Sequence, residues 1–297
     1  MSISTAQYAT LLQRIDELEN DNRFRAHIAA LRKEIDDGMA KSFSLEVAKG
    51  NVPGHSSVNK FGAAPSGVQT TFTDIWARAN AAVTQQVWLA PTAARIHTIS
   101  SDSAADTTGS TGANSVTIYY LPDWDTLEAS ETVTGDLNAG IAMSNAAVII
   151  NRMVVTPQST STSANVGTII ATAATDTTIT AVILPGDGQT EQAIFGFPSI
   201  QTAYMTRWAV GIDKAQGAAA SADFQIMFNP NPDVQTVSFL RKQDMAVQST
   251  GSNAMEKMYS HRPKFDGPGI IKIRANASAN DIDAHADFDL TLVQDGF

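Results

Sequence analysis

Ser115-Val116-Thr117-Ile118-Tyr119-Tyr120 is a run of β-branched and aromatic residues, and this composition favours a β-strand. Arg95-Ile96-His97-Thr98-Ile99 is a second run of the same kind, and a turn-rich segment with Gly109 and Gly112 separates the two. Further short strands are predicted at residues 147–156, 167–173, 177–184, 192–197, 204–212, 224–229, 236–240, 270–276 and 287–293. The pattern predicts a mainly β fold, with an antiparallel β-sandwich or jelly-roll body of one or two domains.

Residues 1–41 are predicted to form one broken helix or two helices. Ser4 and Gln7 have the spacing of a capping box, and apolar residues then recur along one helical face. The apolar residues of this face are Leu11, Ile15, Leu18, Ile28, Leu31 and Ile35. A single narrow apolar face predicts packing on a partner along one seam or packing on the chain's own body, and the pattern does not separate the two.

Residues 42–83 are predicted to be an extended arm or linker, because prolines and glycines interrupt any regular element there. The strand signals that follow are divided into a first β domain, 84–213, and a second β region, 214–297, which completes or adjoins the sandwich. The candidate docking residues are the six apolar residues of the helical face together with Val52, Pro53, His55, Lys60 and Phe61 of the arm.

The composition limits the possible functions. The chain has 297 residues, of which 43% are hydrophobic and only 17% are charged, so uncharged polar residues must cover much of its surface. The formal net charge of -10 disfavours direct binding to nucleic acid. The absence of cysteine excludes disulfides and thiol chemistry. No apolar run is long enough to span a bilayer, so no membrane partner is expected.

No catalytic constellation is evident, so the sequence does not predict an enzyme. A Gly-x-Ser-x-Gly nucleophile elbow is absent, and the glycine-rich turns lack the lysine and helix of a phosphate loop. In the segment 281–289, aspartates and His285 alternate with apolar residues. A strand would place them on one face, where they could hold a divalent cation or face water. The water-facing strand is the preferred interpretation, and no catalytic, cofactor or metal residue is predicted.

Three stretches resemble virion structural proteins of tailed bacteriophages. The first is Val52-Pro53-Gly54-His55-Ser56-Ser57-Val58-Asn59-Lys60-Phe61-Gly62. The second runs from Ser100-Ser101-Asp102-Ser103-Ala104-Ala105-Asp106-Thr107 through Gly112 to Val116-Thr117-Ile118-Tyr119 and Glu131-Thr132-Val133. The third combines Pro185-Gly186-Asp187-Gly188-Gln189-Thr190 with Thr202-Ala203-Tyr204-Met205-Thr206-Arg207-Trp208. The resemblance implies a structural component of a virion and supplies no catalytic residues.

Pattern and resemblance together favour a capsid-associated decoration, cement or head-spike protein of a bacteriophage virion. Its expected partners are itself, as a homotrimer, and other virion proteins such as the major capsid protein. The alternative is a tail or neck-associated protein that binds a receptor or a carbohydrate. Trp76, Trp88, Trp124 and Trp208 could form a sugar-stacking platform, but they lie mostly within apolar segments, so packing in the core is the preferred interpretation.

Overall fold

The computed structural model describes residues 9–10, 13, 43–77, 85–156, 164–213, 220–234, 239–250 and 253–297. The chain divides into two compact units, Met1–Pro53 and Gly54–Phe297. In the first unit, α3 spans Phe43–Ala48. Of the predicted helical segment 1–41, only residues 9, 10 and 13 are described, and all three are helical. The predicted apolar face, from Leu11 to Ile35, therefore lies outside the described residues.

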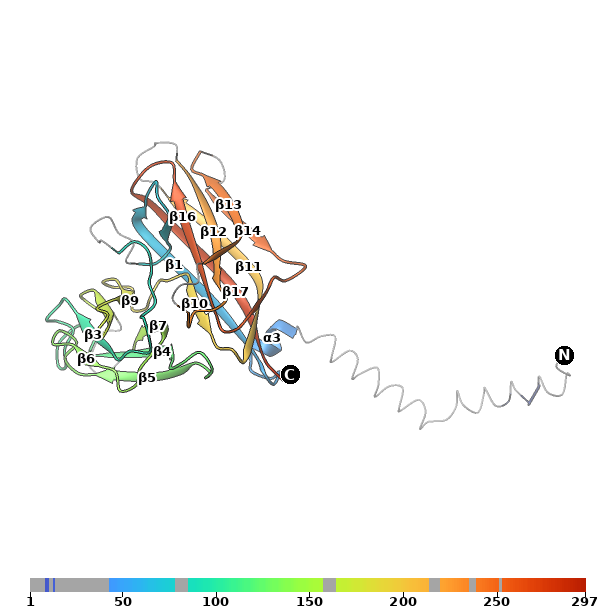
Figure 1. Ribbon diagram of the computed structural model, residues 1–297, viewed down its shortest axis with the longest axis horizontal. Helices are drawn as coiled ribbons and strands as arrows, with labels where there is room; N and C mark the ends of the chain where they lie inside the picture. Colours follow the sequence, from blue (N-terminus) through green and yellow to red (C-terminus); the bar gives the residue numbers. More distant parts are fainter. Residues whose placement is uncertain are drawn as a thin grey trace. The chain divides into compact units, whose positions relative to one another are not determined.

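The larger part of the second unit is a jelly roll. Its eight main strands, in chain order, are β1 (His55–Val68), β10 (Ile194–Phe197), β11 (Gln201–Asp213), β12 (Ser221–Asn229), β13 (Leu240–Gln248), β14 (Ala254–Met258), β16 (Gly269–Ala277) and β17 (Ile282–Gln294). Sheet A has the order β1-β17-β11-β14, and sheet B has the order β10-β16-β12-β13. Numbered along the chain, these orders are 1-8-3-6 and 2-7-4-5, which is the jelly-roll arrangement of two antiparallel sheets. Figure 1 shows β1, β17 and β11 running side by side.

Two short strands each add to one of these sheets by pairing with a single main strand. β15 (Lys264–Asp266) pairs with β11 in sheet A, and β2 (Thr73–Asp74) pairs with β16 in sheet B. The pairing of β2 with β16 is stabilised by an ion pair between Lys272 Nζ and Asp74 Oδ2 at 2.6 Å, in which both side chains are buried.

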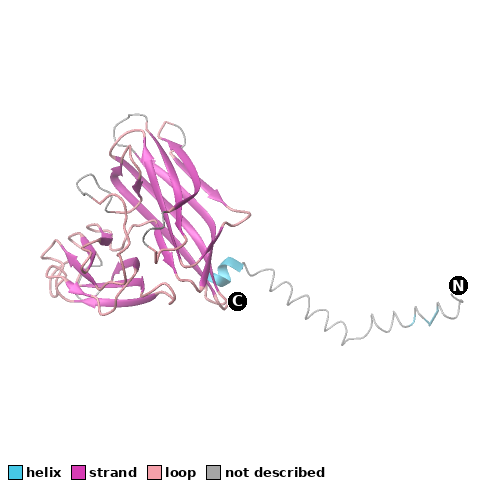
Figure 2. Ribbon diagram, viewed as in Figure 1, coloured by secondary structure: helices cyan, strands magenta, loops and turns pink. Residues whose placement is uncertain are grey.

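A smaller β-sandwich is inserted between β1 and β10. Its strands are β3 (His97–Ser101), β4 (Ser115–Leu121), β5 (Ala129–Thr134), β6 (Ile141–Ala142), β7 (Ile149–Val155), β8 (Ile169–Ala173) and β9 (Ile179–Ile183). They form one sheet of order β6-β3-β8-β9 and another of order β5-β4-β7. Ile99, Val116, Ile118 and Ile169 belong to the buried cluster of this inserted part. Strands and loops account for most of the described residues in Figure 2.

The alternation predicted for residues 281–289 is present in β17. Ile282, Ala284, Ala286 and Phe288 are buried, whereas Asp283, Asp287 and Asp289 are half-buried and His285 is exposed. The buried residues join the core cluster of the jelly roll, which also contains Trp208 and Phe224. The predicted mainly β fold, with a sandwich body, is thereby confirmed.

The arm predicted at 42–83 is corrected by the structure, because His55–Val68 is a full strand of sheet A. β1 pairs with β17 from His55↔Val293 to Ala64↔Ala284. The glycine that suggested an irregular segment has a packing role. A Cβ on Gly62 would lie 2.3 Å from the backbone nitrogen of Ala193, so only glycine allows this close approach.

The predicted domain boundary between residues 213 and 214 also differs from the structure. β10 and β11 were grouped with the first β domain, yet β10 pairs with β16 and β11 pairs with β17 and β14. Both strands belong to the jelly roll, together with the C-terminal third of the chain. The physical reason is that alternation identifies a strand without identifying the distant strand that accepts its hydrogen bonds.

Candidate functional site

The predicted docking residues that the structure describes are divided between the two units. Val52 and Pro53 follow α3 in the N-terminal unit, where Val52 is half-buried and Pro53 is exposed. His55, Lys60 and Phe61 belong to β1 in the second unit. Lys60 is only 7% exposed, and its side chain lies inside the folded body. The prediction that Lys60 is a docking residue is therefore corrected.

Lys60 belongs to a buried polar cluster that connects the jelly roll with the inserted sandwich. Its Nζ donates a hydrogen bond of 2.5 Å to the backbone oxygen of Asn151 in β7. The Asn151 side chain donates to Glu128 Oε1 at 2.8 Å and to the backbone oxygen of Gly196 in β10 at 2.9 Å. The Gly196 nitrogen donates back to Asn151 Oδ1 at 2.8 Å. These contacts join β1, β7 and β10, so the cluster has a structural role.

Burial dominates the electrostatics of this cluster. Desolvation lowers the pKa of Lys60 to about 7, although the nearby Glu128 carboxylate acts in the opposite direction. Desolvation also raises the pKa of Glu128, against the hydrogen bond from Asn151 and the charge of Lys60. A lysine with a lowered pKa can act as a base or nucleophile. Here the side chain is enclosed, so the altered pKa bears on stability.

Asp106, from the second stretch of the resemblance, is a fully buried carboxylate with four hydrogen bonds. Oδ1 accepts from the nitrogens of Ala113 and Val166, at 2.8 and 2.9 Å. Oδ2 accepts from Ser101 Oγ at 2.6 Å and from the Gly167 nitrogen at 2.8 Å. These bonds connect the loop after β3 with the start of β8. The motif therefore specifies a loop structure.

The turn at residues 185–190, from the third stretch, is held in a similar way. Asn165 is buried, and its Nδ2 donates to the Leu184 oxygen at 2.8 Å, while its Oδ1 accepts from the Gly188 nitrogen at 3.1 Å. Gln189 Oε1 accepts from Arg152 Nη2 at 2.8 Å. The polar residues of the turn thus mostly serve contacts within the inserted sandwich.

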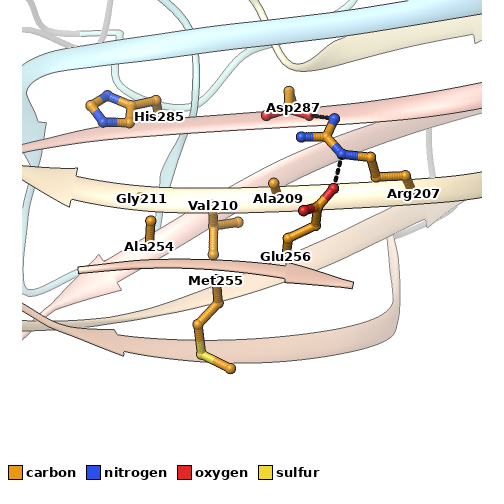
Figure 3. A pocket seen from close by; sticks show the side chains of 9 residues that line it. All are labelled: Arg207, Ala209, Val210, Gly211, Ala254, Met255, Glu256, His285 and Asp287. Atoms are coloured by element: carbon orange, nitrogen blue, oxygen red, sulfur yellow. Dashed lines mark hydrogen bonds and ion pairs between the residues drawn. The ribbon is translucent and has the colours of Figure 1, made fainter. Parts of the chain in front are cut away.

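The outer face of sheet A carries a shallow depression of about 330 Å³. Its base is made of small residues, because Gly211 of β11 lies opposite Ala254 of β14 and Ala209 lies two residues away along β11. A Cβ on Gly211 would lie 2.9 Å from His285 Cδ2, so the glycine leaves room for the imidazole ring. Figure 3 shows His285 at one end of the depression and Arg207 at the other.

Arg207 lies between carboxylates from the two neighbouring strands. Its guanidinium pairs with Glu256 of β14 and Asp287 of β17, and Asp289 Oδ2 is 3.6 Å away (Figure 3). The hydrogen bond to Glu256, with the charge of Asp287, raises the pKa of Arg207. Burial raises the pKa of Asp287 and outweighs the opposing effect of Arg207. The residues that line the depression include no serine, threonine or lysine, and the carboxylates of Glu256 and Asp287 are paired with Arg207.

Other sequence hypotheses can be compared with the described residues. Trp76, Trp88 and Trp208 are buried, and Trp124 packs partly buried against the jelly-roll core, which confirms their predicted place in the core. Over the ranges that the structure describes, no group of three or more histidine, aspartate or glutamate side chains is arranged to hold a metal ion. No helix within those ranges is long and apolar enough to cross a membrane.

Comparisons with known proteins give no family assignment. No protein-family model matches the chain, and no curated protein matches it. A chain from the crystal structure of the T13 IBDV viral particle is 7% identical, with 82% of this chain and 70% of that chain covered and a TM-score of 0.17. A chain from the infectious bursal disease virus Gx strain is 7% identical, with 82% and 72% covered and a TM-score of 0.18. At such low TM-scores, the alignments do not indicate a shared fold.

Proposed function

We propose that this chain is a non-enzymatic structural component of a bacteriophage virion, of the capsid-associated decoration, cement or head-spike type. It docks through its N-terminal unit and assembles as a homotrimer on other virion proteins such as the major capsid protein. The division of the chain into Met1–Pro53 and a separate β unit, Gly54–Phe297, is the observation that carries the proposal. This division provides one part for attachment and another that folds around its own cores.

The burial of polar residues in and around the three stretches supports a structural role. Lys60 and Asp106 come from the first two stretches that resemble virion proteins, and Asn165 holds the turn of the third; all three are buried in hydrogen-bond networks. Such residues specify strand and loop positions, whereas catalysis requires a reactive group that a substrate can reach. The packing of these residues thus supports the structural role that the resemblance implies.

The jelly-roll topology is consistent with this proposal, because double-sheet jelly rolls are found in viral capsid domains and in lectin domains. A fold does not determine a function, so the topology supports only the class of structural virion proteins. The specific role has to be tested at the docking segment. The candidate docking face, from Leu11 to Ile35, gives a specific site for a test.

The proposal is tested by replacing Leu18 and Leu31 with aspartate in phage that carry the altered chain. If a neighbouring virion protein covers these leucines, each substitution removes about 2 kcal/mol of favourable burial free energy. Each new carboxylate also adds a desolvation cost of several kcal/mol. The expected result is loss of the chain from purified particles, measured by gel and mass spectrometry. The melting temperature of the isolated protein should stay unchanged.

A matched control replaces Thr10 and Gln13, which are exposed helical residues of the same segment, with aspartate. This variant adds the same charge and should be incorporated normally. Normal incorporation of the leucine variant would refute docking through this face. A lowered melting temperature would show that the segment packs on its own body, and absence of the wild-type chain from particles would refute the virion assignment.

A further inference from the structure

The outer face of sheet B has a second hollow, of about 360 Å³, on the other sheet of the jelly roll from Arg207. It lies over three neighbouring strands, β16, β12 and β13, which are adjacent in Figure 1. In one row across these strands, Asp223 pairs with Asn276 on one side and Ala246 on the other. The small side chain of Ala246 leaves space at the end of this row.

A second row of the same face adds further polar groups. Gln225 pairs with Arg274 of β16 on one side and Asp244 of β13 on the other. Side chains directly opposite one another on neighbouring strands have Cβ atoms about 5 Å apart. The two rows therefore bring amide, carboxylate and guanidinium groups from three strands to a single face, and Arg241 adds one more charge to the lining.

An aromatic ring borders the hollow. Phe72, just before β2, is 37% exposed although it is a large apolar side chain. The Arg274 guanidinium lies over the ring, 4.2 Å from its centroid, and Arg274 Nε donates to Gln225 Oε1 at 3.0 Å. Gln225 is itself only 7% exposed. The ring is thus held in place by a cation-π contact that rests on a buried amide.

Several polar groups of the hollow are accessible to a ligand. Asp223, Asp244 and Arg241 are exposed and line the hollow. Asn276 Oδ1 is buried and has no hydrogen-bond partner among the residues that the structure describes. A buried acceptor without a partner costs free energy, so a ligand that donates a hydrogen bond there would gain affinity.

We propose that this hollow binds a neutral carbohydrate. Phe72 provides an apolar ring against which the C–H face of a sugar packs, and the surrounding groups bind its hydroxyls. Each hydroxyl both donates and accepts, so it satisfies the Asp223 and Asp244 carboxylates and Asn276 Oδ1 as well as the Arg241 guanidinium. A concave site with one aromatic surface and a few convergent polar groups is the usual form of a small-ligand site.

The charge of the lining favours a neutral ligand over an ion. Asp223 and Asp244 are balanced by Arg241 and by Arg274, which lies over the Phe72 ring, so neither sign predominates. The formal net charge of -10 on the whole chain also disfavours phosphate-bearing ligands such as nucleotides. This site differs from the tryptophan platform considered from the sequence, because three of those tryptophans are fully buried.

The test is a glycan array of neutral and acidic bacterial oligosaccharides, probed with the isolated full-length protein. Isothermal titration then measures the affinity for any neutral oligosaccharide that is retained. Phe72→Ala removes the stacking surface, and Ala246→Tyr fills the hollow without removing a polar group. Each substitution is expected to weaken binding by about tenfold or more, as for a central binding residue.

Phe297→Ala is the matched control, because Phe297 is another exposed phenylalanine and does not line the hollow. It should leave both the affinity and the melting temperature unchanged. The proposal is overturned if no glycan is retained, if only acidic glycans are retained, or if both variants at the hollow bind as wild type. The isolated protein is used, so this outcome is independent of incorporation into particles.

Discussion

The jelly roll and the inserted sandwich are both β-sandwiches, but their strands pair over very different distances in the chain. In the jelly roll, β1 pairs with β17, so His55 lies opposite Val293. In the inserted sandwich, all strands come from the single segment His97–Ile183. The comparison teaches that the jelly roll depends on both ends of the second unit, whereas the insertion closes by local pairing, which has a lower entropic cost.

The largest expected effect follows from this dependence on β1. Deletion of residues 1–62 removes the first eight residues of β1, which pair with the half of β17 closest to the C-terminus. This truncated chain should be unfolded or aggregated, since the β17 backbone and Phe288 would lose their cover. An extended arm at 42–83, as the sequence predicts, would instead leave a folded body after this deletion. Circular dichroism and sizing chromatography measure the result.

Deletion of residues 1–42 is the control for that experiment, because it leaves α3 and β1 complete. It should retain a cooperative melting transition at the wild-type temperature. A native melting curve for the longer deletion would show that β1 is dispensable and would contradict the role given to it in closing the jelly roll.

A smaller effect is expected inside the inserted sandwich. Asp106→Ala leaves four donors without their acceptor, three of them in buried and one in a part-buried hydrogen bond, which should cost about 3 kcal/mol or more. Hydrogen exchange should increase first in β3 and β8, while β17 stays protected. Asp233→Ala, at an exposed aspartate, is the control and should change little. Equal loss of protection in β17 would show that the two sandwiches unfold as one.

The lowered pKa of Lys60, which lies between the two sandwiches, predicts that the free energy of unfolding depends on pH. In the folded chain its pKa is about 7, against the ordinary 10.5, so between these values the unfolded chain binds one more proton. Raising the pH from 7 to 10.5 should therefore stabilise the fold, by up to about 1.4 kcal/mol per pH unit. Lys60→Met should remove this increase.

The measurement is the difference in melting temperature between wild type and Lys60→Met, recorded from pH 6 to 10. The difference should shift in favour of the wild type as the pH rises above 7. Lys49→Met, at an exposed lysine, is the control and should give a curve parallel to wild type. A constant difference between wild type and Lys60→Met would show that Lys60 keeps its ordinary pKa.

The smallest effect is expected at the outer face of sheet A. Arg207→Ala breaks ion pairs with Glu256 and Asp287, but all three side chains are partly exposed. The cost should be about 1 kcal/mol or less, and it should decrease in high salt. Thermal melting at low and high salt checks this. A large loss of stability that does not change with salt would contradict this and would show that Arg207 is an essential packing residue.

The sequence was most informative where a strand's own residues determine its conformation. The prediction at 177–184 contains β9 (Ile179–Ile183), and that at 204–212 falls within β11. β14 was missed because all five of its residues are exposed and lack an apolar alternation. β1 was missed because Gly62 signals a break unless the approach of Ala193 is known.

The candidate sites were less predictable, because they combine distant segments. The hollow on sheet B joins Phe72 with Asp223, Asp244 and Asn276, which belong to four separate parts of the chain. The burial of Lys60 depends on Asn151, which is 91 residues away. Neither arrangement leaves a local pattern, so strand pairing had to be known before the side chains could be grouped.

The most direct test of the central claim is a cryo-electron microscopy map of purified phage particles that contain this chain. The account predicts density for both β-sandwiches outside the shell, with residues 1–53 in contact with a neighbouring virion protein. The account is contradicted if the particles lack this density. It is also contradicted if the jelly roll makes every contact with the shell and residues 1–53 make none.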